Sequence, residues 1–276
     1  MSSEENIKAL LELLSKEPRR STELSAELAR IIKDQPREFK NVINSSYGGS
    51  APAFVADIIT AVQREALAMP FKWYFNKHSP DLISGLILLA KFITPGIKDA
   101  DIIAPLNTFK AKLAQDMDGS FDIFHKAEIF ERIIFGAFSF KLESLGANAR
   151  LLSLPDMVRR RRTTVFSMAA LYALLAADFD IWADITDIAG KPVVRLRDGA
   201  TFEPVYIDIT AKGRFVGEDD CHIYAAGNGG EWNPAVIKPM SNKQIIKRLL
   251  TNLIYVYAKT DITAADILRR ILKAAA

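Results

Sequence analysis

The sequence predicts an α+β protein in which helices precede and follow a small antiparallel sheet. The first half of the chain carries apolar residues three and four positions apart, which is the spacing of amphipathic helices. After Asp180 the pattern changes to short segments rich in β-branched and aromatic residues, with turn signals between them. The last part returns to helical spacing. Helices and strands segregated in this way are typical of the α+β class.

Short helices are expected over the first seventy-five residues. Helical spacing predicts helices over residues 7–14 and 24–32, and Pro36 is expected to open a third helix to about Ile43. Residues 44–52 are rich in Gly, Ser and Pro and predict a loop. A further amphipathic helix is expected over residues 54–67. Short antiparallel helix pairs resemble HEAT-like packing, although a single copy does not establish a repeat.

A second group of helices is expected before the sheet. Ser79, Pro80 and Asp81 predict a helix start, with a cap, a proline in the first turn and an acid against the helix dipole. This helix is expected to end near Thr94 and Pro95, because the residue before a proline disfavours helical geometry. Two more helices are expected over residues 102–113 and 121–138.

Three or four short antiparallel strands are expected between residues 182 and 207. Turn signals at residues 189–190 and 198–199 separate them, and a glycine-rich loop is expected over 226–239. The tail predicts a helical hairpin, with a stripe over 245–254 and a second helix capped by Asp261. We therefore expect three regions: a helical N-terminal region over 1–75, a central domain that contains the sheet over 76–240, and the helical hairpin over 241–276.

Composition limits the classes of function. The net charge of +3 is too small and unclustered for a nucleic-acid-binding surface. The single cysteine, Cys221, excludes an intrachain disulfide framework and fits a reducing compartment. The polar start MSSEENIK lacks the pattern of a secretory signal, and the most apolar run, residues 82–89, is far shorter than a membrane span. We therefore expect a soluble, cytoplasmic protein.

Residues 154–172, LPDMVRRRRTTVFSMAALY, resemble the core motif of the transglutaminase-like superfamily in its SirB-type branch. That motif has a leucine-rich lead-in, paired arginines, a glycine, a proline or cysteine two residues before a serine, and a helix with a Leu-Tyr pair. The matching positions are Arg161, Arg162, Ser167, Leu171 and Tyr172. The glycine is replaced by Thr163, and the proline-or-cysteine position, which is the nucleophile position, is Val165.

Two later segments extend the resemblance. Residues 189–195, AGKPVVR, match a family strand that carries Pro-Gly-His and an arginine, with Lys191 at the histidine and Arg195 at the arginine. Residues 206–208, YID, match the element that ends in the third catalytic residue, Asp208, and Cys221 matches a cysteine that the branch often carries. The resemblance implies a papain-like core, a helical lead-in and, over residues 245–272, a tetratricopeptide-like tail.

The substituted positions argue against the family's acyl-transfer chemistry. That chemistry needs a thiolate, a base that forms it and a group that orients the base. Val165 has no nucleophilic atom, and Lys191 is protonated near neutral pH unless it is strongly desolvated. Asp208 remains, and we expect it to pair with Lys191 through a salt bridge. The resemblance therefore implies a degenerate triad of Val165, Lys191 and Asp208.

Each of these residues also fits a purely structural role. Val165 fits a core position at a helix start, Lys191 an exposed turn lysine, and Asp208 a structural cap. The run from Arg159 to Arg162 fits either a solvated face or a site for phosphate or an acidic partner. Trp182 and Arg195 are further candidates for ligand or partner contacts.

Three other residues carry a nucleophilic atom near the degenerate triad in sequence: Cys221, Ser167 and Thr164. Cys221 and His222 are adjacent, but on a strand their side chains point to opposite faces, and Cys221 fits a buried, inert thiol. Ser167 and Thr164 are alternative hydroxyl nucleophiles. One cysteine and three scattered histidines do not have the spacing of a zinc site, so neither a metal nor a cofactor is expected.

The sequence favours a non-catalytic transglutaminase-like scaffold that acts as a protein-interaction or regulatory module. The first alternative is a divergent hydrolase or acyltransferase that uses Cys221 or Ser167. The second is a carrier that binds a small ligand in the former substrate cleft. A protein partner is expected, and neither nucleic acid nor a membrane is.

Overall fold

The computed structural model describes residues 3–16, 22–117, 122–188, 191–197, 204–227, 233 and 238–275. It divides the chain into two compact units, residues 1–69 and 70–276. The helical first half, the small four-stranded antiparallel sheet and the C-terminal helix pair confirm the predicted α+β class. Within the described ranges no helix is long and apolar enough to cross a membrane.

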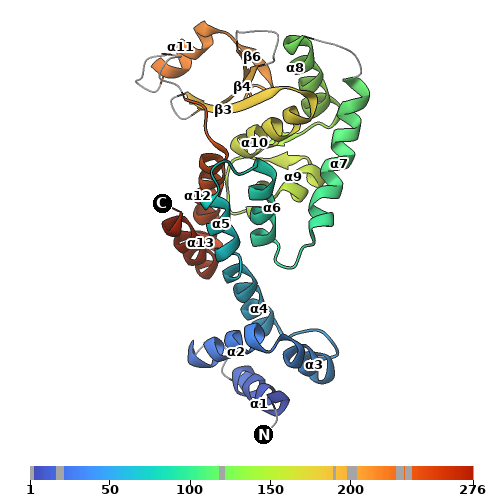
Figure 1. Cartoon of the computed structure of the whole chain (residues 1–276), viewed down its shortest axis with the longest axis vertical. Helices are drawn as coiled ribbons and strands as arrows, with labels where there is room; N and C mark the ends of the chain where they lie inside the picture. Colours follow the sequence, from blue (N-terminus) through green and yellow to red (C-terminus); the bar gives the residue numbers. More distant parts are fainter. Residues whose placement is uncertain are drawn as a thin grey trace. The chain divides into compact units, whose positions relative to one another are not determined.

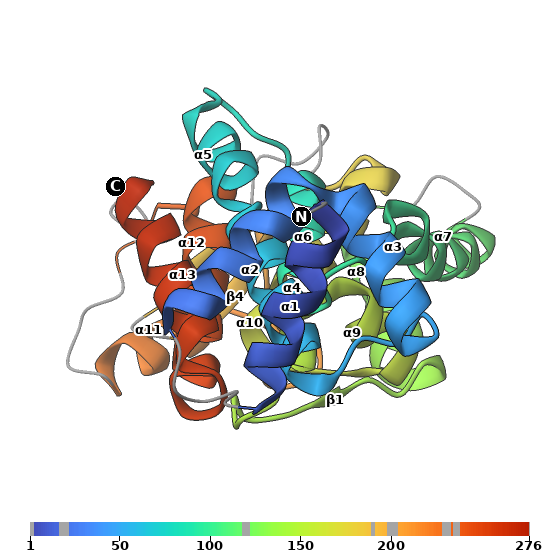
Figure 2. The same ribbon diagram turned by 90° about the horizontal axis from the view of Figure 1, so that it is seen from below.

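The first unit is a group of four amphipathic helices. They are α1 (Ser3–Lys16), α2 (Thr22–Asp34), α3 (Pro36–Tyr47) and α4 (Ala53–Glu65). Helices α1, α2 and α3 each contact the other two (Figure 2), and their apolar faces form one core around Ile7, Leu11 and Val42. Pro36 opens α3 as expected, but the helix continues past Ile43. It ends at Gly48, whose left-handed φ of 61° lets its N–H reach the Ile43 carbonyl.

The second unit contains the remaining helices. They are α5 (Ala68–Asn76), α6 (Leu82–Ile93), α7 (Asp99–Asp116), α8 (Ile123–Glu131) with a π-helical extension (Arg132–Ala137), α9 (Leu154–Arg160), α10 (Val165–Ala176), α11 (Glu218–Ala226), α12 (Asn242–Thr260) and α13 (Ile262–Ala274). Short 3₁₀ turns at Ala149–Leu152 and Ala177–Phe179 precede α9 and follow α10.

The start of α6 differs from the prediction in one respect. Its cap is Asp81 and not Ser79, because the Asp81 carboxylate accepts a hydrogen bond from the Ser84 N–H at 2.8 Å. Pro80 therefore lies before the helix. The end of α6 at Ile93, before Thr94 and Pro95, confirms the predicted boundary.

The sheet consists of β3 (Trp182–Ile188), β4 (Lys191–Arg197), β5 (Val205–Asp208) and β6 (Arg214–Val216), in that order. All three pairings are antiparallel, with Ile188 opposite Lys191 and Val193 opposite Asp208. A separate two-residue parallel pair joins β1 (Lys141–Leu142) to β2 (Arg162–Thr163). The predicted turns at 189–190 and 198–199 and most of the predicted 226–239 loop lie outside the described residues.

Each face of the sheet is covered by a different helix. Side chains alternate along a strand, so Val193 and Val194 point to opposite faces. Helix α10 packs on β3 and β4, and α11 contributes Cys221 and Ala225 to an apolar cluster with Val193. Figure 1 shows α10 and α11 on opposite sides of β3. The sheet is therefore a partition between two separate environments.

The C-terminal helices form the predicted hairpin. Ser241 caps α12, and the Asp261 carboxylate accepts from the Ala264 N–H at 3.0 Å to cap α13, as expected. Helix α12 also packs against α6 at Gly85. A Cβ atom added to Gly85 would lie 2.5 Å from the Cγ1 atom of Ile246, so this close approach requires glycine.

We predict that Gly85→Ala destabilises the protein. The added methyl group overlaps Ile246, and overpacking of this kind costs about 1–3 kcal/mol. Urea unfolding of the full chain measures the free energy, with Gly146→Ala as the matched control because its Cβ would meet no atom within 4 Å. Equal stability of the two variants would show that α6 and α12 do not pack as closely as described.

Candidate functional site

Lys191 and Asp208 lie on neighbouring strands and form an ion pair. Lys191 begins β4 and Asp208 ends β5, and both belong to the face of the sheet that α11 covers. Lys191 Nζ lies 2.7 Å from Asp208 Oδ2. The Asp208 side chain is 1% exposed and the Lys191 side chain 26%. The expected pairing of these two residues is therefore present.

The Asp208 carboxylate accepts hydrogen bonds on both oxygens. Oδ1 accepts from the Thr210 N–H at 2.7 Å and the Thr210 hydroxyl at 2.6 Å, with the Ala211 N–H at 3.3 Å. Oδ2 accepts from the Tyr224 hydroxyl at 2.8 Å, in addition to the ion pair. These donors compensate the cost of burying a charge. They also hold the chain in the tight turn after β5, which is a structural role for Asp208.

Tyr224 of α11 closes the arrangement from above the sheet. Its ring centroid lies 3.4 Å from Lys191 Nζ, so the ammonium rests on the aromatic face. Because the Tyr224 hydroxyl binds Asp208 as well, Lys191, Asp208 and Tyr224 contact one another pairwise. We call this set of three residues the lysine clamp.

The clamp stabilises the charged forms of both Lys191 and Asp208. Burial alone would lower the pKa of Lys191, but its contacts with Asp208 and Tyr224 outweigh burial and raise it above the usual value. Burial would raise the pKa of Asp208, but the bonds from Lys191, Thr210 and Tyr224 lower it below the usual value. Lys191 is thus a cation at neutral pH with no free electron pair, and it is unsuited to act as a general base.

Val165, which the resemblance would align with the nucleophile, lies at the start of α10. Thr164 caps this helix and its hydroxyl oxygen accepts from the Ser167 N–H at 3.3 Å. Val165 is the first helical residue and is half-buried. The predicted placement of Val165 at a helix start is confirmed, and the side chain adds an apolar surface there.

The sheet separates the start of α10 from the lysine clamp. Phe166 packs under Arg248, whose guanidinium carbon is 4.5 Å from the ring centroid, and Arg248 forms an ion pair with Asp187. Asp187 is opposite Pro192 in the β3–β4 register, so it faces away from the side of Lys191. The structure thus unites Lys191 with Asp208 but directs both away from the α10 face.

Cys221 and His222 lie on helix α11 and not on a strand. The predicted strand was wrong because the acidic residues after Gly217 indicate the first turn of a helix. The Gly217 N–H donates to the Asp220 carboxylate in that turn. Cys221 is 0% exposed and packs with Ile188 and Val193, while His222 is exposed. The two side chains therefore do not form a thiol–imidazole pair.

Ser167 is buried and committed to local structure. Its hydroxyl oxygen accepts from the Thr164 hydroxyl at 3.0 Å, so the two alternative hydroxyl nucleophiles bind each other at the start of α10.

The four arginines of the run from Arg159 to Arg162 are exposed and take different partners. Arg159 donates to the Asp101 carbonyl, Arg160 to Asp156 and Arg162 to Glu143, while Arg161 lies over Phe138. Because the partners lie on different elements, the run does not present one continuous cationic surface.

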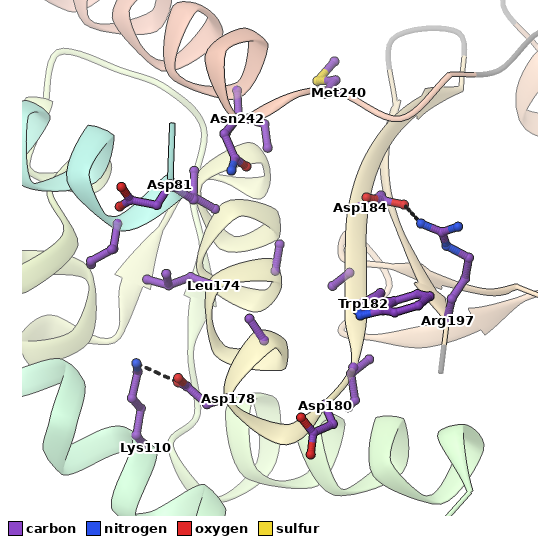
Figure 3. Close-up of a pocket in the computed structure, with 17 residues that line it drawn as sticks. Asp81, Lys110, Leu174, Asp178, Asp180, Trp182, Asp184, Arg197, Met240 and Asn242 are labelled. Atoms are coloured by element: carbon purple, nitrogen blue, oxygen red, sulfur yellow. Dashed lines mark hydrogen bonds and ion pairs between the residues drawn. The ribbon is translucent and has the colours of Figure 1, made fainter. Parts of the chain in front are cut away.

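A cavity of about 720 Å³ lies at the other end of α10, bordered by the start of β3 (Figure 3). Trp182, predicted as a contact residue, forms part of its wall and is 62% exposed. Arg195 is not part of the cavity wall, but it and the wall residue Arg197 both pair with Asp184, at 2.7 and 2.9 Å. The wall combines residues 173–184 with residues 81–83 and 240–245, which are distant in sequence, so no local pattern identified it.

No three metal-binding side chains converge within the part of the chain that the structure describes. The clamp itself is a buried ion pair held by hydrogen bonds. Its consequence is a dependence of stability on pH.

We predict that Asp208→Asn destabilises the protein at pH 7 by about 1–3 kcal/mol, because it leaves buried donors without their carboxylate. The pKa of Asp208 is lowered in the folded state, so its contribution is present above the unfolded pKa of about 3.9 and is lost as pH falls through the folded pKa. The difference between wild type and variant should shrink in acid. The raised pKa of Lys191 places the alkaline loss above about 10.4.

Urea unfolding from pH 7 to acid measures this difference, with the exposed Asp219→Asn as the control. A difference that stays constant down to strong acid would contradict the assignment of the charged pair.

The comparisons with known proteins agree with the resemblance at the level of the superfamily. A family model described as transglutaminase-like superfamily matches residues 100–251, which is more than half of the chain. The match includes α10, the whole sheet and the lysine clamp. Searches of curated proteins and of solved structures found no match. On the strength of the family match, this chain belongs to the transglutaminase-like superfamily.

Proposed function

We propose that this chain is a non-catalytic member of the superfamily, of the SirB-type branch, that acts by binding in the cytoplasm. The observation that carries the proposal is the lysine clamp. Lys191, at the position of the family's base, is protonated and held by Asp208 and Tyr224. A general base must hold a free electron pair within reach of the proton it removes, and this ammonium has none.

The nucleophile position supports the same conclusion. Val165 supplies no atom that can attack a carbonyl carbon. It also begins a helix on the α10 face, whereas Lys191 and Asp208 belong to the α11 face. A thiol introduced by Val165→Cys and an imidazole introduced by Lys191→His would therefore lie on opposite sides of the sheet.

A divergent hydrolase fits the geometry less well. The Cys221 thiol lies in an apolar cluster, and an apolar setting disfavours the thiolate that reacts. The Ser167 hydroxyl is bound to Thr164 and is 1% exposed, so neither candidate reaches solvent next to a base.

The α12–α13 hairpin is the surface that we assign to a protein partner. It resembles a tetratricopeptide-like helix pair, and helix pairs of this kind present side chains to peptides and to other helices. Tyr255 is 50% exposed and Ile262 59%, and both belong to this hairpin. Exposed large apolar side chains of this kind are typical of contact surfaces.

For the catalytic question, we predict no turnover of peptide, ester or amide substrates. Cys221→Ser and Ser167→Ala should leave the background rate unchanged, and an alkylating reagent should modify Cys221 far more slowly in the folded than in the urea-unfolded chain. Turnover by the wild type that either substitution abolishes would overturn the non-catalytic proposal.

For the binding question, we predict that replacing both Tyr255 and Ile262 with alanine abolishes retention of partners that the wild type captures from a cell extract. Ile223→Ala is the matched control, because Ile223 is 65% exposed on α11 and outside the hairpin. Truncating an exposed anchor residue typically costs an interface about 1–2 kcal/mol, which is roughly tenfold in affinity. Equal retention by both variants would remove the hairpin as the partner surface.

A further inference from the structure

The sheet face that α11 covers becomes more exposed toward the start of β3 and the end of β4. Where α11 packs, Ile188 and Val193 are fully buried. At the other end the Arg195 side chain is 18% exposed, that of Arg197 40%, and Trp182 62%. The strand register places all five residues on this face, because side chains two positions apart on a strand point the same way. The face therefore has a closed end and an open end.

Two arginines share one carboxylate at the open end. Oδ2 of Asp184 accepts from Nη2 of Arg195 at 2.7 Å and from Nη2 of Arg197 at 2.9 Å. Figure 3 shows Asp184, Arg197 and Trp182 on the same side of β3, as the register requires. Because two cations face a single anion, this group of side chains carries an excess of one positive charge.

The hydrogen-bonding capacity of this surface is only partly used. The Nε atoms of Arg195 and Arg197 are buried and have no partner among the described residues, and the same holds for the hydroxyl of Thr186. Thr186 is 1% exposed and lies two residues from Asp184 on the same face of β3, a separation of about 6–7 Å. A buried donor without an acceptor has lost its bonds to water and gained none in exchange. Three such groups therefore mark this surface as one that an added acceptor would stabilise.

The outer ends of the two guanidinium groups are the point of access. The Nη1 atoms of Arg195 and Arg197 are not among the buried atoms, and no described residue accepts a hydrogen bond from them. A guanidinium group matches the geometry of a carboxylate, and Asp184 already demonstrates this with both arginines. One further carboxylate would neutralise the excess charge, whereas a doubly charged phosphate would exceed it and repel Asp184.

Trp182 adds an apolar surface beside the two cations. The guanidinium carbon of Arg197 lies 5.7 Å from the indole ring centroid, yet most of the Trp182 side chain remains exposed. Small ligands bind in clefts that enclose most of their surface, and this open face does not enclose a ligand in that way. Tryptophan and arginine are enriched among the residues that dominate protein–protein interfaces. The surface therefore suits a protein partner.

We propose that this surface docks a protein segment in which an Asp or Glu side chain is next to an apolar one. Its residues are Trp182, Asp184, Arg195 and Arg197, and we call them the arginine surface. The partner's carboxylate binds the outer ends of the two guanidinium groups, and its apolar neighbour packs on the indole. The arginine surface shares no residue with the lysine clamp or the α12–α13 hairpin, so the inference stands or fails separately from the proposed function.

The indole N–H signal of Trp182 in the NMR spectrum of the isotope-labelled full chain tests this inference. Trp182→Leu identifies the signal, and N-acetyl-Leu-Glu-Leu amide is the probe. The probe should shift the signal, and less so as salt rises. The Gln analogue should not shift it, and propionate should bind more weakly because it has no apolar neighbour for the indole. The signal of Trp73, which is also 62% exposed, should not move.

Three outcomes of these titrations would contradict the inference. The first is no shift of the Trp182 signal with the Glu peptide. The second is an equal shift with the Gln peptide, which would show that the carboxylate is not read. The third is equally tight binding of propionate, which would assign the arginine surface to a free acid instead of a protein segment.

Two substitutions assign the contacts. Arg197→Gln should weaken binding of the Glu peptide roughly twofold to fivefold, the range for an exposed ion pair. Asp184→Asn removes the internal competitor and leaves both guanidinium groups, so binding should strengthen by roughly the same factor. A purely structural role of Asp184 would not produce this gain. Arg214→Gln is the matched control, because Arg214 lies on the same face but has Asp220 to itself at 3.2 Å.

Circular dichroism checks that each variant is folded. The inference is wrong if Arg197→Gln binds the peptide as tightly as Arg214→Gln does, or if folded Asp184→Asn binds it no more tightly than the wild type. Should Asp184→Asn fail to fold, Arg197→Gln and the Gln peptide still decide the outcome.

Discussion

Burial of helix α10 is the constraint on which the arrangement of the second unit depends. Ten of its twelve residues are buried, so the helix has no solvent face and must be enclosed on every side. Burying a large apolar side chain contributes about 1.5–3 kcal/mol, and Met168, Leu171 and Leu175 are all fully buried. The sheet closes one side through β3 and β4. Helix α12 contacts α10 as well, and Phe130 of α8 packs on Tyr172 at a centroid distance of 4.8 Å.

The two ends of α10 have different surroundings as a result. Its start carries the Thr164 cap and the Phe166–Arg248 contact. Its end runs into a short 3₁₀ turn and then into β3, and the cavity borders that junction. The acids that follow the helix, Asp178 and Asp180, stand at its negative end, where a cation is the favourable neighbour.

Much of the fold was predictable because local sequence patterns determine its helices and strands. The period of the apolar residues separated helices from strands, and Asp261 was identified as the cap of α13. The errors have local causes too. Asp81 competes with Ser79 as a cap and prevails, and the short helix α11 has too few turns for its apolar period to outweigh the neighbouring strands.

The candidate sites were predictable to a smaller degree, because they depend on contacts between distant residues. The Lys191–Asp208 pair was expected from the family pattern, but Tyr224 was not, since nothing in its own segment marks it as the third member of the clamp. The opposite placement of Val165 follows from strand register and from the helix that covers each face. The cavity joins the start of α6, the end of α10 and the start of α12, and no window of sequence contains all three.

The lysine clamp and the cavity beside Trp182 share no residue. The clamp satisfies a buried carboxylate with a lysine and a tyrosine, so it is a structural contact that stabilises the turn after β5. None of the three clamp residues belongs to the cavity wall, and neither does Val165. A change at Val165 or in the lysine clamp therefore alters none of the residues in the cavity wall. Residues that are more than about 10 Å apart and share no partner contribute to stability independently. The packing of the C-terminal end of α10 thus does not depend on the side chains at its start.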